Sequence, residues 1–229
     1  MLTRQAIHSG AYFESFEASP NRWTIERIES SLKETLARRP GRGNDVWIFA
    51  YGSLMWNPAV KFDARRVASL DNWHRAFCLR MEAGRATAER PGRMLALRPG
   101  GSTQGLALRL AADTLDEELR LVWVREMVLG SYRPTWVSLA LEGGETVDGI
   151  AFVADESRDQ YESDASVATV APLIHQAHGR FGSNAEYLSK LHAALHAWGL
   201  RDPYVQTLES RVGRPEPTPG LAGSIDFDA

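Results

Sequence analysis

The sequence contains few of the residues on which several classes of protein depend. Its single cysteine, Cys78, rules out a disulfide within the chain, which is the usual state in a reducing cytosol. Lysine occurs only at Lys33, Lys61 and Lys190, and a net charge of −3 without any basic run argues against a nucleic-acid partner. We find neither a signal peptide nor an apolar run of membrane-spanning length. These absences predict a cytoplasmic protein with no nucleic-acid or membrane partner, and they leave partner proteins unknown.

Several motifs of catalytic and metal sites are missing too. The chain has no Gly-Lys-Ser/Thr phosphate loop and no Gly-x-Gly-x-x-Gly turn, so nucleotide chemistry is not expected. Ser53 is no hydrolase nucleophile elbow, because tyrosine and methionine replace the required flanking glycines. His192 and His196 lack the Glu of a His-Glu-x-x-His pattern, and His175 and His178 have no evident third ligand. We therefore expect no metal site.

The length and composition favour one main domain with extensions at both ends. A chain of 229 residues with 44% apolar residues can bury a sizeable core. Residues 1 to about 22 show no usable period and are predicted to be a loosely held arm. A helix should start at Thr24 and pack outside the main domain. We divide the chain into an arm and helix at 1–45, a domain at 46–212, and a disordered tail at 213–229.

Most segments of the central region indicate strands. They lie at 46–51, 67–70, 73–81, 93–98, 104–110, 136–141 and 146–153, with turn signals at Pro91-Gly92, Pro99-Gly100-Gly101 and Gly143-Gly144. A mostly antiparallel sheet that curls into a barrel is the economical arrangement. Later helices are predicted at about 166–179, 185–198 and 203–212, with Asn184 and Asp202 as caps, and should cover the barrel. Cys78 falls within a strand and is expected in the core.

The turn after the first predicted strand is a candidate site. It reads Tyr51-Gly52-Ser53-Leu54. Gly52 has no Cβ, so it can take unusual backbone angles and let a ligand approach the main chain. Consecutive N–H groups at such a turn can hold an oxyanion without a metal or cofactor. The alternative is an ordinary loop, since Gly-Ser is a common turn dipeptide.

A helix predicted at about 114–129 carries an acidic residue on its apolar face. The stripe that runs through Leu119 reaches Glu126, where another apolar side chain was due. Charged groups are rarely buried unless they are paired or functional, so the break in the pattern indicates a catalytic carboxylate. Alternatively, Glu126 lies beyond the buried part and pairs with Arg125 or Arg133 at the surface.

Four blocks of sequence, taken in order, resemble the ChaC family of γ-glutamylcyclotransferases. They are Trp47 to Pro58, Trp73 to Cys78, Arg90 to Leu97, and Arg125-Glu126-Met127 followed by Tyr132-Arg133-Pro134, and together they cover roughly 46–212. The resemblance implies an α+β fold, a γ-glutamylcyclotransferase-like closed mixed β-barrel with flanking helices. It also implies cofactor-independent cleavage of a small-molecule substrate, glutathione, to 5-oxoproline and cysteinylglycine.

The resemblance assigns roles to individual residues. The turn Tyr51 to Leu54 matches the one that holds the γ-glutamyl group, and Glu126 matches the family's catalytic glutamate. Tyr187 matches a late tyrosine that borders the pocket, although a tyrosine that only packs the helix is an equal alternative. The chain departs from the family after Arg85, where alanine replaces glycine, and near 161–164. We assign Arg85 to the distal carboxylate of the substrate; the alternative is a solvated arginine.

Two other functions stay open at this point. The substrate could be another γ-glutamyl amide, because the same mechanism serves any such compound. The domain could also be a non-catalytic γ-glutamyl-binding module linked to cation transport. Keeping a buried carboxylate would cost a binding-only protein several kcal/mol of desolvation, which favours the enzyme.

Overall fold

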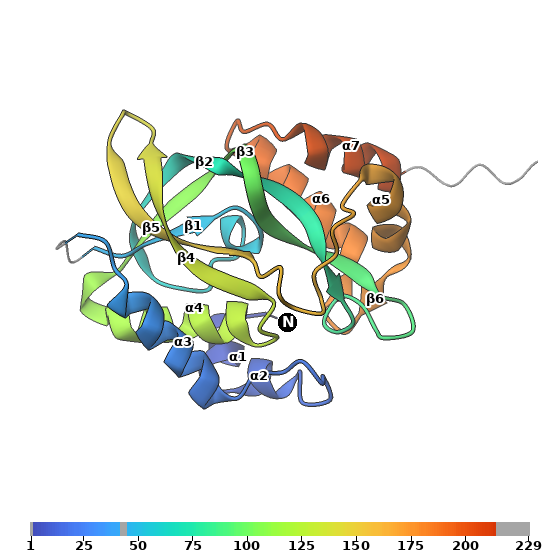
Figure 1. Cartoon of the computed structure of the whole chain (residues 1–229), viewed down its shortest axis with the longest axis horizontal. Coiled ribbons are helices and arrows are strands. Elements are labelled where there is room, and N and C mark those ends of the chain that lie inside the picture. The colour runs from blue at the N-terminus through green and yellow to red at the C-terminus, as the bar shows by residue number, and fades with distance from the viewer. Residues whose placement is uncertain (1, 42–44, 214–229) are drawn as a thin grey trace, which may run out of the picture.

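A closed barrel of five strands forms the centre of the computed structural model, which describes residues 2–41 and 45–213 (Figure 1). The strands are β1 (Trp47–Ala50), β2 (Phe62–Met81), β3 (Gly92–Leu110), β4 (Tyr132–Leu141) and β5 (Thr146–Ala154). Their order is β1-β3-β2-β4-β5, with antiparallel neighbours, and a parallel pairing of β1 with β5 closes the ring. The predicted closed mixed barrel with flanking helices is thereby confirmed.

The two long strands differ from the prediction. Each was expected as two strands separated by a turn, but β2 and β3 run continuously and pair with each other along most of their length. Gly100 and Gly101 do adopt positive φ values of 102° and 70°, opposite Asn72 at 65°. The ladder shifts register beside Asn72, so these residues form a bulge that bends the strand pair. The residues that predicted a turn at this point therefore form a bend within one strand.

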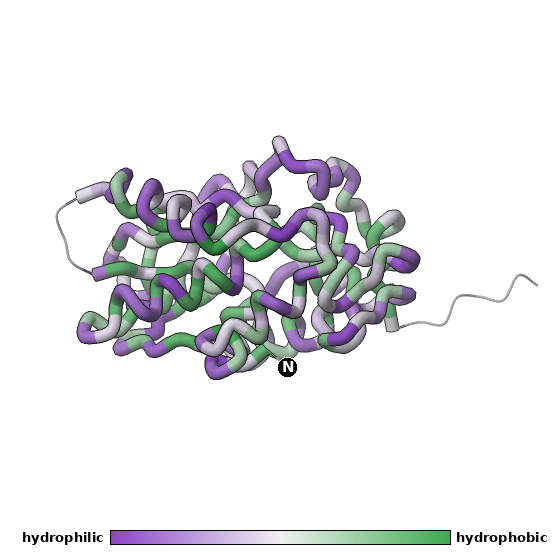
Figure 2. The backbone as a smooth tube through the Cα atoms, turned by 90° about the horizontal axis from the view of Figure 1, so that it is seen from below, coloured by the Kyte–Doolittle hydropathy of each residue, from purple (hydrophilic) through white to green (hydrophobic). Residues whose placement is uncertain are grey.

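Buried apolar side chains fill the barrel and the layer between it and α4 (Leu115–Met127). Phe49, Phe77 and Phe152 come from three different strands and have almost no exposed surface. Trp123 of α4 meets Phe152 edge to face at 5.1 Å between ring centroids. In Figure 2, hydrophobic stretches run through the middle of the molecule, with hydrophilic stretches along its periphery. Cys78 is a core residue as predicted, and burial raises the pKa of its thiol to about 12.

Three helices cover one side of the barrel, as predicted (Figure 1). They are α5 (Val167–Gln176), α6 (Asn184–Ala197) and α7 (Pro203–Val212). Asp202 caps α7 by accepting a hydrogen bond from Val205 N at 3.1 Å, as predicted. The predicted cap of α6 is wrong: the cap is Ser183, whereas Asn184 is fully buried and accepts a hydrogen bond from Arg93 N. In the parts that the structure describes, no helix is long and apolar enough to cross a membrane.

The N-terminal segment is not a loose arm, contrary to the prediction. It forms α1 (Arg4–His8) and α2 (Ala11–Glu14), and α3 (Ile25–Ala37) follows with Thr24 as its cap. Ile7 and Phe16 are buried, and these helices lie alongside α4 in Figure 1. Sequence periodicity could not find α1 and α2, because helices this short show no repeated stripe. The division of the chain at residue 45 stays a prediction. The tail predicted from residue 213 lies, except for Gly213, outside the described residues.

Candidate active site

The turn after β1 presents backbone N–H groups at the end of a fully buried strand. Tyr51 is buried, and its hydroxyl donates to the carbonyl of Phe152 on β5. The chain then forms a 3₁₀ turn, η1 (Ser53–Met55), closed by a 2.9 Å bond from Met55 N to Gly52 O. The N–H groups of Ser53 and Leu54 precede that first bond, so the helix itself provides no acceptor for them. The Tyr187 hydroxyl oxygen is placed to accept from Ser53 N–H, so a ligand would share that donor and would have Leu54 N–H to itself.

Position 52 requires a glycine because neighbouring side chains leave no room for a Cβ, and not because of its φ angle. Its φ of −130° lies outside the left-handed region, and with ψ at −132° the pair belongs to neither the helical nor the extended region, so the backbone is unusual, as expected. A Cβ built on Gly52 would lie 2.9 Å from Tyr187 Oη and 3.4 Å from Leu95 Cδ2. The missing Cβ thus lets the Tyr187 hydroxyl lie against the turn. Tyr187 is itself buried and packs edge to face on Trp56, with ring centroids 5.3 Å apart.

Glu126 lies in the last turn of α4 and faces the same space. Leu119 and Val122 of the predicted stripe are buried, and the Glu126 side chain is only 14% exposed. Glu126 does pair with Arg125, at 2.9 Å from Nε to Oε1, but the Arg125 side chain is 2% exposed. The pair is enclosed, so the alternative of a surface ion pair is wrong. Burial raises the pKa of the Glu126 carboxyl, against a lowering effect from Arg125.

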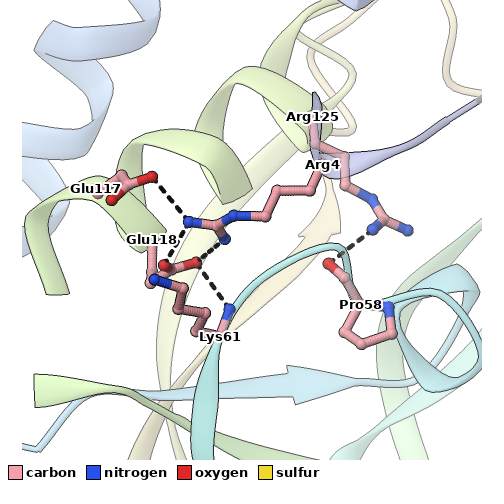
Figure 3. Close-up of polar contacts among 6 residues, drawn as sticks. All are labelled: Arg4, Pro58, Lys61, Glu117, Glu118 and Arg125. Carbon is pink, nitrogen blue, oxygen red and sulfur yellow. Dashed lines mark hydrogen bonds and ion pairs between the residues drawn. The ribbon is translucent and has the colours of Figure 1, made fainter. Parts of the chain in front are cut away.

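Arg125 joins the helix of Glu126 to the turn. Its Nη2 donates to Ser53 Oγ at 2.7 Å, and its Nη1 donates to the carbonyl of Asn57. Nη1 also donates to the carbonyl of Pro58, and this bond is drawn in Figure 3. These bonds hold the carboxylate and the N–H groups of the turn in one geometry. The sequence offered Arg125 only as a possible surface partner of Glu126, because its acceptors lie about seventy residues away along the chain.

One cavity of about 770 Å³ brings the predicted site residues together. All of them line it: Tyr51, Gly52, Ser53, Leu54, Arg85, Glu126 and Tyr187. Its volume lies within the range of about 300–1,000 Å³ that is usual for small-molecule sites. A second hollow of about 820 Å³, at the starts of α5 and α7, contains none of these residues. The first cavity is therefore the candidate active site.

Tyrosines surround the carboxylate. Burial raises the pKa of Tyr12, Tyr51, Tyr132 and Tyr187, and the charge of Glu126 raises it further. These phenols are consequently neutral at physiological pH. Tyr132 donates to the carbonyl of Leu95 at 2.8 Å and lines the cavity. Sequence reasoning did not select Tyr132 or Tyr12; Tyr132 lay in a block of family resemblance, whereas nothing in the sequence indicated Tyr12.

Arg85 lies at the rim of the cavity, in the connection between β2 and β3. Its Nη1 donates to the carbonyl of Ser183 and to the carboxylate of Glu186, each at 2.9 Å. The side chain is 17% exposed, so it is held against the protein rather than extended into water. Both of these bonds use Nη1, which leaves the donors on Nη2 and Nε for a substrate carboxylate.

The histidine pairs do not gather metal ligands in the part of the chain that the structure describes. Among residues 2–41 and 45–213, no group of three or more His, Cys, Asp or Glu side chains could hold a metal ion. The Nδ1 atom of His175 instead lies 3.2 Å from the carbonyl of Val212.

Comparison with known proteins identifies the family. Residues 46–215 match the family model described as "ChaC-like protein". The chain belongs to the ChaC family. The predicted family is thereby confirmed.

Similar ChaC-family proteins have been named. An Escherichia coli (strain K12) protein named "Glutathione-specific gamma-glutamylcyclotransferase" is 52% identical over 204 residues. The match covers 88% of this chain and 88% of that one. The human "Glutathione-specific gamma-glutamylcyclotransferase 1" is 28% identical over 182 residues, covering 77% of this chain and 82% of that one. A crystal structure of a yeast γ-glutamyl cyclotransferase specific to glutathione superposes with a TM-score of 0.69 at 21% identity. It covers 74% of this chain and 96% of its own, and at this identity it establishes the shared fold.

Proposed function

We propose that this ChaC-family protein is a γ-glutamylcyclotransferase that cleaves glutathione into 5-oxoproline and cysteinylglycine. The observation that carries the proposal is the enclosed carboxyl of Glu126, which shares one cavity with the N–H groups of the turn at Gly52. The name of the Escherichia coli relative, at 52% identity, supports the choice of glutathione. The substrate is thus a small molecule.

The reaction requires little of the protein beyond positioning. In a γ-glutamyl amide, the α-amine of the substrate can attack its own γ-carbonyl and close a five-membered ring. A C–N bond forms in the ring, and the C–N bond to the departing amine breaks. Because the nucleophile belongs to the substrate, the protein needs only to hold the curled conformer. The turn Tyr51 to Leu54 is our candidate for that task, since its residues and the surrounding tyrosines line the cavity.

Two protein groups remain to be provided, a proton carrier and an oxyanion site. The α-amine is a cation at neutral pH and loses two protons on the way to the ring amide. Glu126 takes these protons one at a time and passes them to the departing amine, which leaves as an ammonium ion. The raised pKa of the carboxyl suits a group that must both accept and donate. The N–H groups of Ser53 and Leu54 donate to the oxyanion, and each such donor typically lowers the barrier by about 3–4 kcal/mol.

Incubating the purified protein with glutathione in the presence of EDTA tests the function. Mass spectrometry should detect 5-oxoproline and cysteinylglycine in equal amounts, and the Glu126→Gln variant should yield neither. Glutathione binding without product would support the non-catalytic module instead. Product from other γ-glutamyl amides, but none from glutathione, would retain the mechanism and change the substrate. Activity lost in EDTA and restored by zinc would overturn the metal-free mechanism.

Turnover should fall as the pH decreases through the pKa of Glu126. Burial raises that pKa above the ordinary glutamate value of about 4.3, and Arg125 only partly opposes the shift. A base acts only when it is ionised, so activity is present above the raised pKa and lost below it. The pH profile of kcat measures this group in the substrate complex. A kcat that stays constant down to about pH 4 would contradict the assignment.

Replacing Arg85 by alanine should raise KM only for substrates that have a distal carboxylate. We expect KM for glutathione to rise at least about tenfold, since a hydrogen bond to a charged group is lost. γ-Glutamyl-alanine amide lacks the distal carboxylate and should be almost unaffected. Arg90→Ala is the matched control, because Arg90 is exposed in the same connection and does not line the cavity. Equal losses on both substrates would indicate that Arg85 only supports the loop through Glu186.

We further propose a cytoplasmic location. The single cysteine is buried, so the chain depends on no disulfide and suits a reducing compartment.

A further inference from the structure

We propose that residues 2–16 complete the active-site cavity and that Tyr12 and Phe16 limit the size of the amine that leaves the γ-glutamyl group. This inference rests on the proposed cyclotransferase function. The segment precedes the stretch that matches the ChaC-like model, residues 46–215, so it adds a wall to the site from outside the matched region. Leu2, Thr3, Arg4, Tyr12 and Phe16 all line the cavity.

An ion pair with a buried carboxylate holds the segment in place. Figure 3 shows the guanidinium of Arg4 between Glu117 and Glu118 of α4. The Glu118 side chain has no exposed surface, and it accepts from Arg4 Nη2 at 2.7 Å and from Lys61 N at 2.8 Å. Burial acts to raise the pKa of Glu118, but the bonds from Arg4 and Lys61 outweigh it and lower that pKa. A buried carboxylate without its cation is strongly unfavourable, so Glu118 requires Arg4 to be docked.

Further hydrogen bonds attach the segment to three other places around the cavity. Asn57, just after the turn at Gly52, donates from Nδ2 to the carbonyl of Leu2 at 2.9 Å. The Tyr12 hydroxyl donates to the carbonyl of Arg125 at 3.1 Å, beside the catalytic carboxylate. Arg180 donates to the carbonyl of Ser15 at 3.0 Å. The segment is therefore anchored at the helix of Glu126, at the turn and at the loop before α6.

The aromatic side chains of the segment face the side of the cavity where Arg85 lies. Tyr12 stacks on Phe181 at 6.0 Å, and Phe16 meets both rings edge to face at 5.2 and 5.8 Å. Phe181 in turn packs on Gly84, where a Cβ would lie 3.3 Å from its ring. The three rings thus form a wall from Arg125 to the connection that carries Arg85. This is the side on which we place the departing amine.

Rigid aromatic walls exclude substrates by size, so a substrate with a larger leaving amine tests the proposal. S-Benzylglutathione has the γ-glutamyl group of glutathione and a larger leaving amine. We expect Phe16→Ala to raise the ratio of kcat/KM for S-benzylglutathione to that for glutathione by at least about tenfold, the discrimination typical of a few methylene groups. Phe16→Leu should change the ratio in the same direction by less, and it guards against a misfolded alanine variant.

The matched control is Phe13→Ala. Phe13 lies in α2, three residues before Phe16, does not line the cavity, and packs under the Arg22 guanidinium at 4.8 Å. Its replacement should leave the ratio of the two substrates unchanged. If Phe16→Ala and Phe16→Leu, both folded by circular dichroism, give the same ratio as Phe13→Ala, the size-limiting role is overturned. A wild-type protein that makes no 5-oxoproline would instead overturn the proposed function, so the two failures are distinguishable.

A pair of neighbouring glutamates tests the docking itself. Glu118→Gln removes the buried charge that Arg4 neutralises, whereas Glu117→Gln changes a side chain that is 45% exposed. Hydrogen exchange of residues 2–16 should accelerate in Arg4→Ala and Glu118→Gln and stay unchanged in Glu117→Gln. The same two variants should also accept S-benzylglutathione more readily. Faster exchange with an unchanged substrate ratio would show that the segment only stabilises the fold, and would overturn its role as a cavity wall.

Discussion

Glu126→Gln is expected to lower kcat by about 10²–10⁴-fold, the range that general acid–base catalysis typically contributes. Glutamine has the shape of glutamate and can still accept a hydrogen bond from Arg125, so the cavity should keep its geometry. It cannot carry a proton between the α-amine and the departing amine. We therefore expect glutathione to bind with a nearly unchanged Kd while 5-oxoproline formation is lost. Isothermal titration and mass spectrometry measure these two quantities separately.

The control for this variant is Glu117→Gln on the same helix. Glu117 is on the exposed side of α4, and its one ion pair within the described residues is with Arg4, so its replacement should leave kcat unaffected. Retention of more than about a tenth of wild-type kcat in Glu126→Gln, a loss of under about 1.4 kcal/mol in transition-state stabilisation, would be inconsistent with Glu126 as the proton carrier. In that case one of the neighbouring tyrosines would be the next group to replace.

Gly52→Val should weaken glutathione binding severely and also destabilise the fold. Its Cβ would fall 2.9 Å from Tyr187 Oη and 3.4 Å from Leu95 Cδ2, and the two γ-methyl groups would have to displace these side chains or enter the cavity where the substrate binds. Overpacking of this kind costs about 1–3 kcal/mol of stability. The displaced turn would also move the N–H groups of Ser53 and Leu54 away from the substrate. Thermal unfolding and KM measure the two effects.

A double mutant separates packing from a direct role of the turn. Gly52→Ala adds only the Cβ, and Tyr187→Phe removes the oxygen that this Cβ would meet. We expect the double mutant to recover most of the stability that Gly52→Ala loses, because the close contact is gone. An unchanged KM in Gly52→Val would show that the turn is only a loop.

Local patterns in the sequence were sufficient to identify the centre of the site. The strand at Trp47–Ala50 ends in a turn at Gly52, and both features depend on neighbouring residues alone. The stripe of α4 identified Glu126, because helical geometry places residues four apart on one face. The family resemblance predicted the closed barrel, and a further match, outside the four blocks, pointed to Tyr187. All the residues predicted for the site line a single cavity.

The sequence could not show contacts between residues that lie far apart along the chain. The role of Arg125 in joining the helix to the turn depends on a contact with Ser53, which lies 72 residues away along the chain. Arg4 and Glu118 are 114 residues apart, and neither breaks a local pattern strongly enough to predict a buried pair. Residues 2–16 form helices too short to produce a period, so they appeared to be a loose arm until their partners were known. Local propensity and periodicity thus determined the strand regions, the turn and the position of the candidate carboxylate. Only tertiary packing decided what encloses them, because burial depends on which distant side chains supply the opposing charge and the opposing surface.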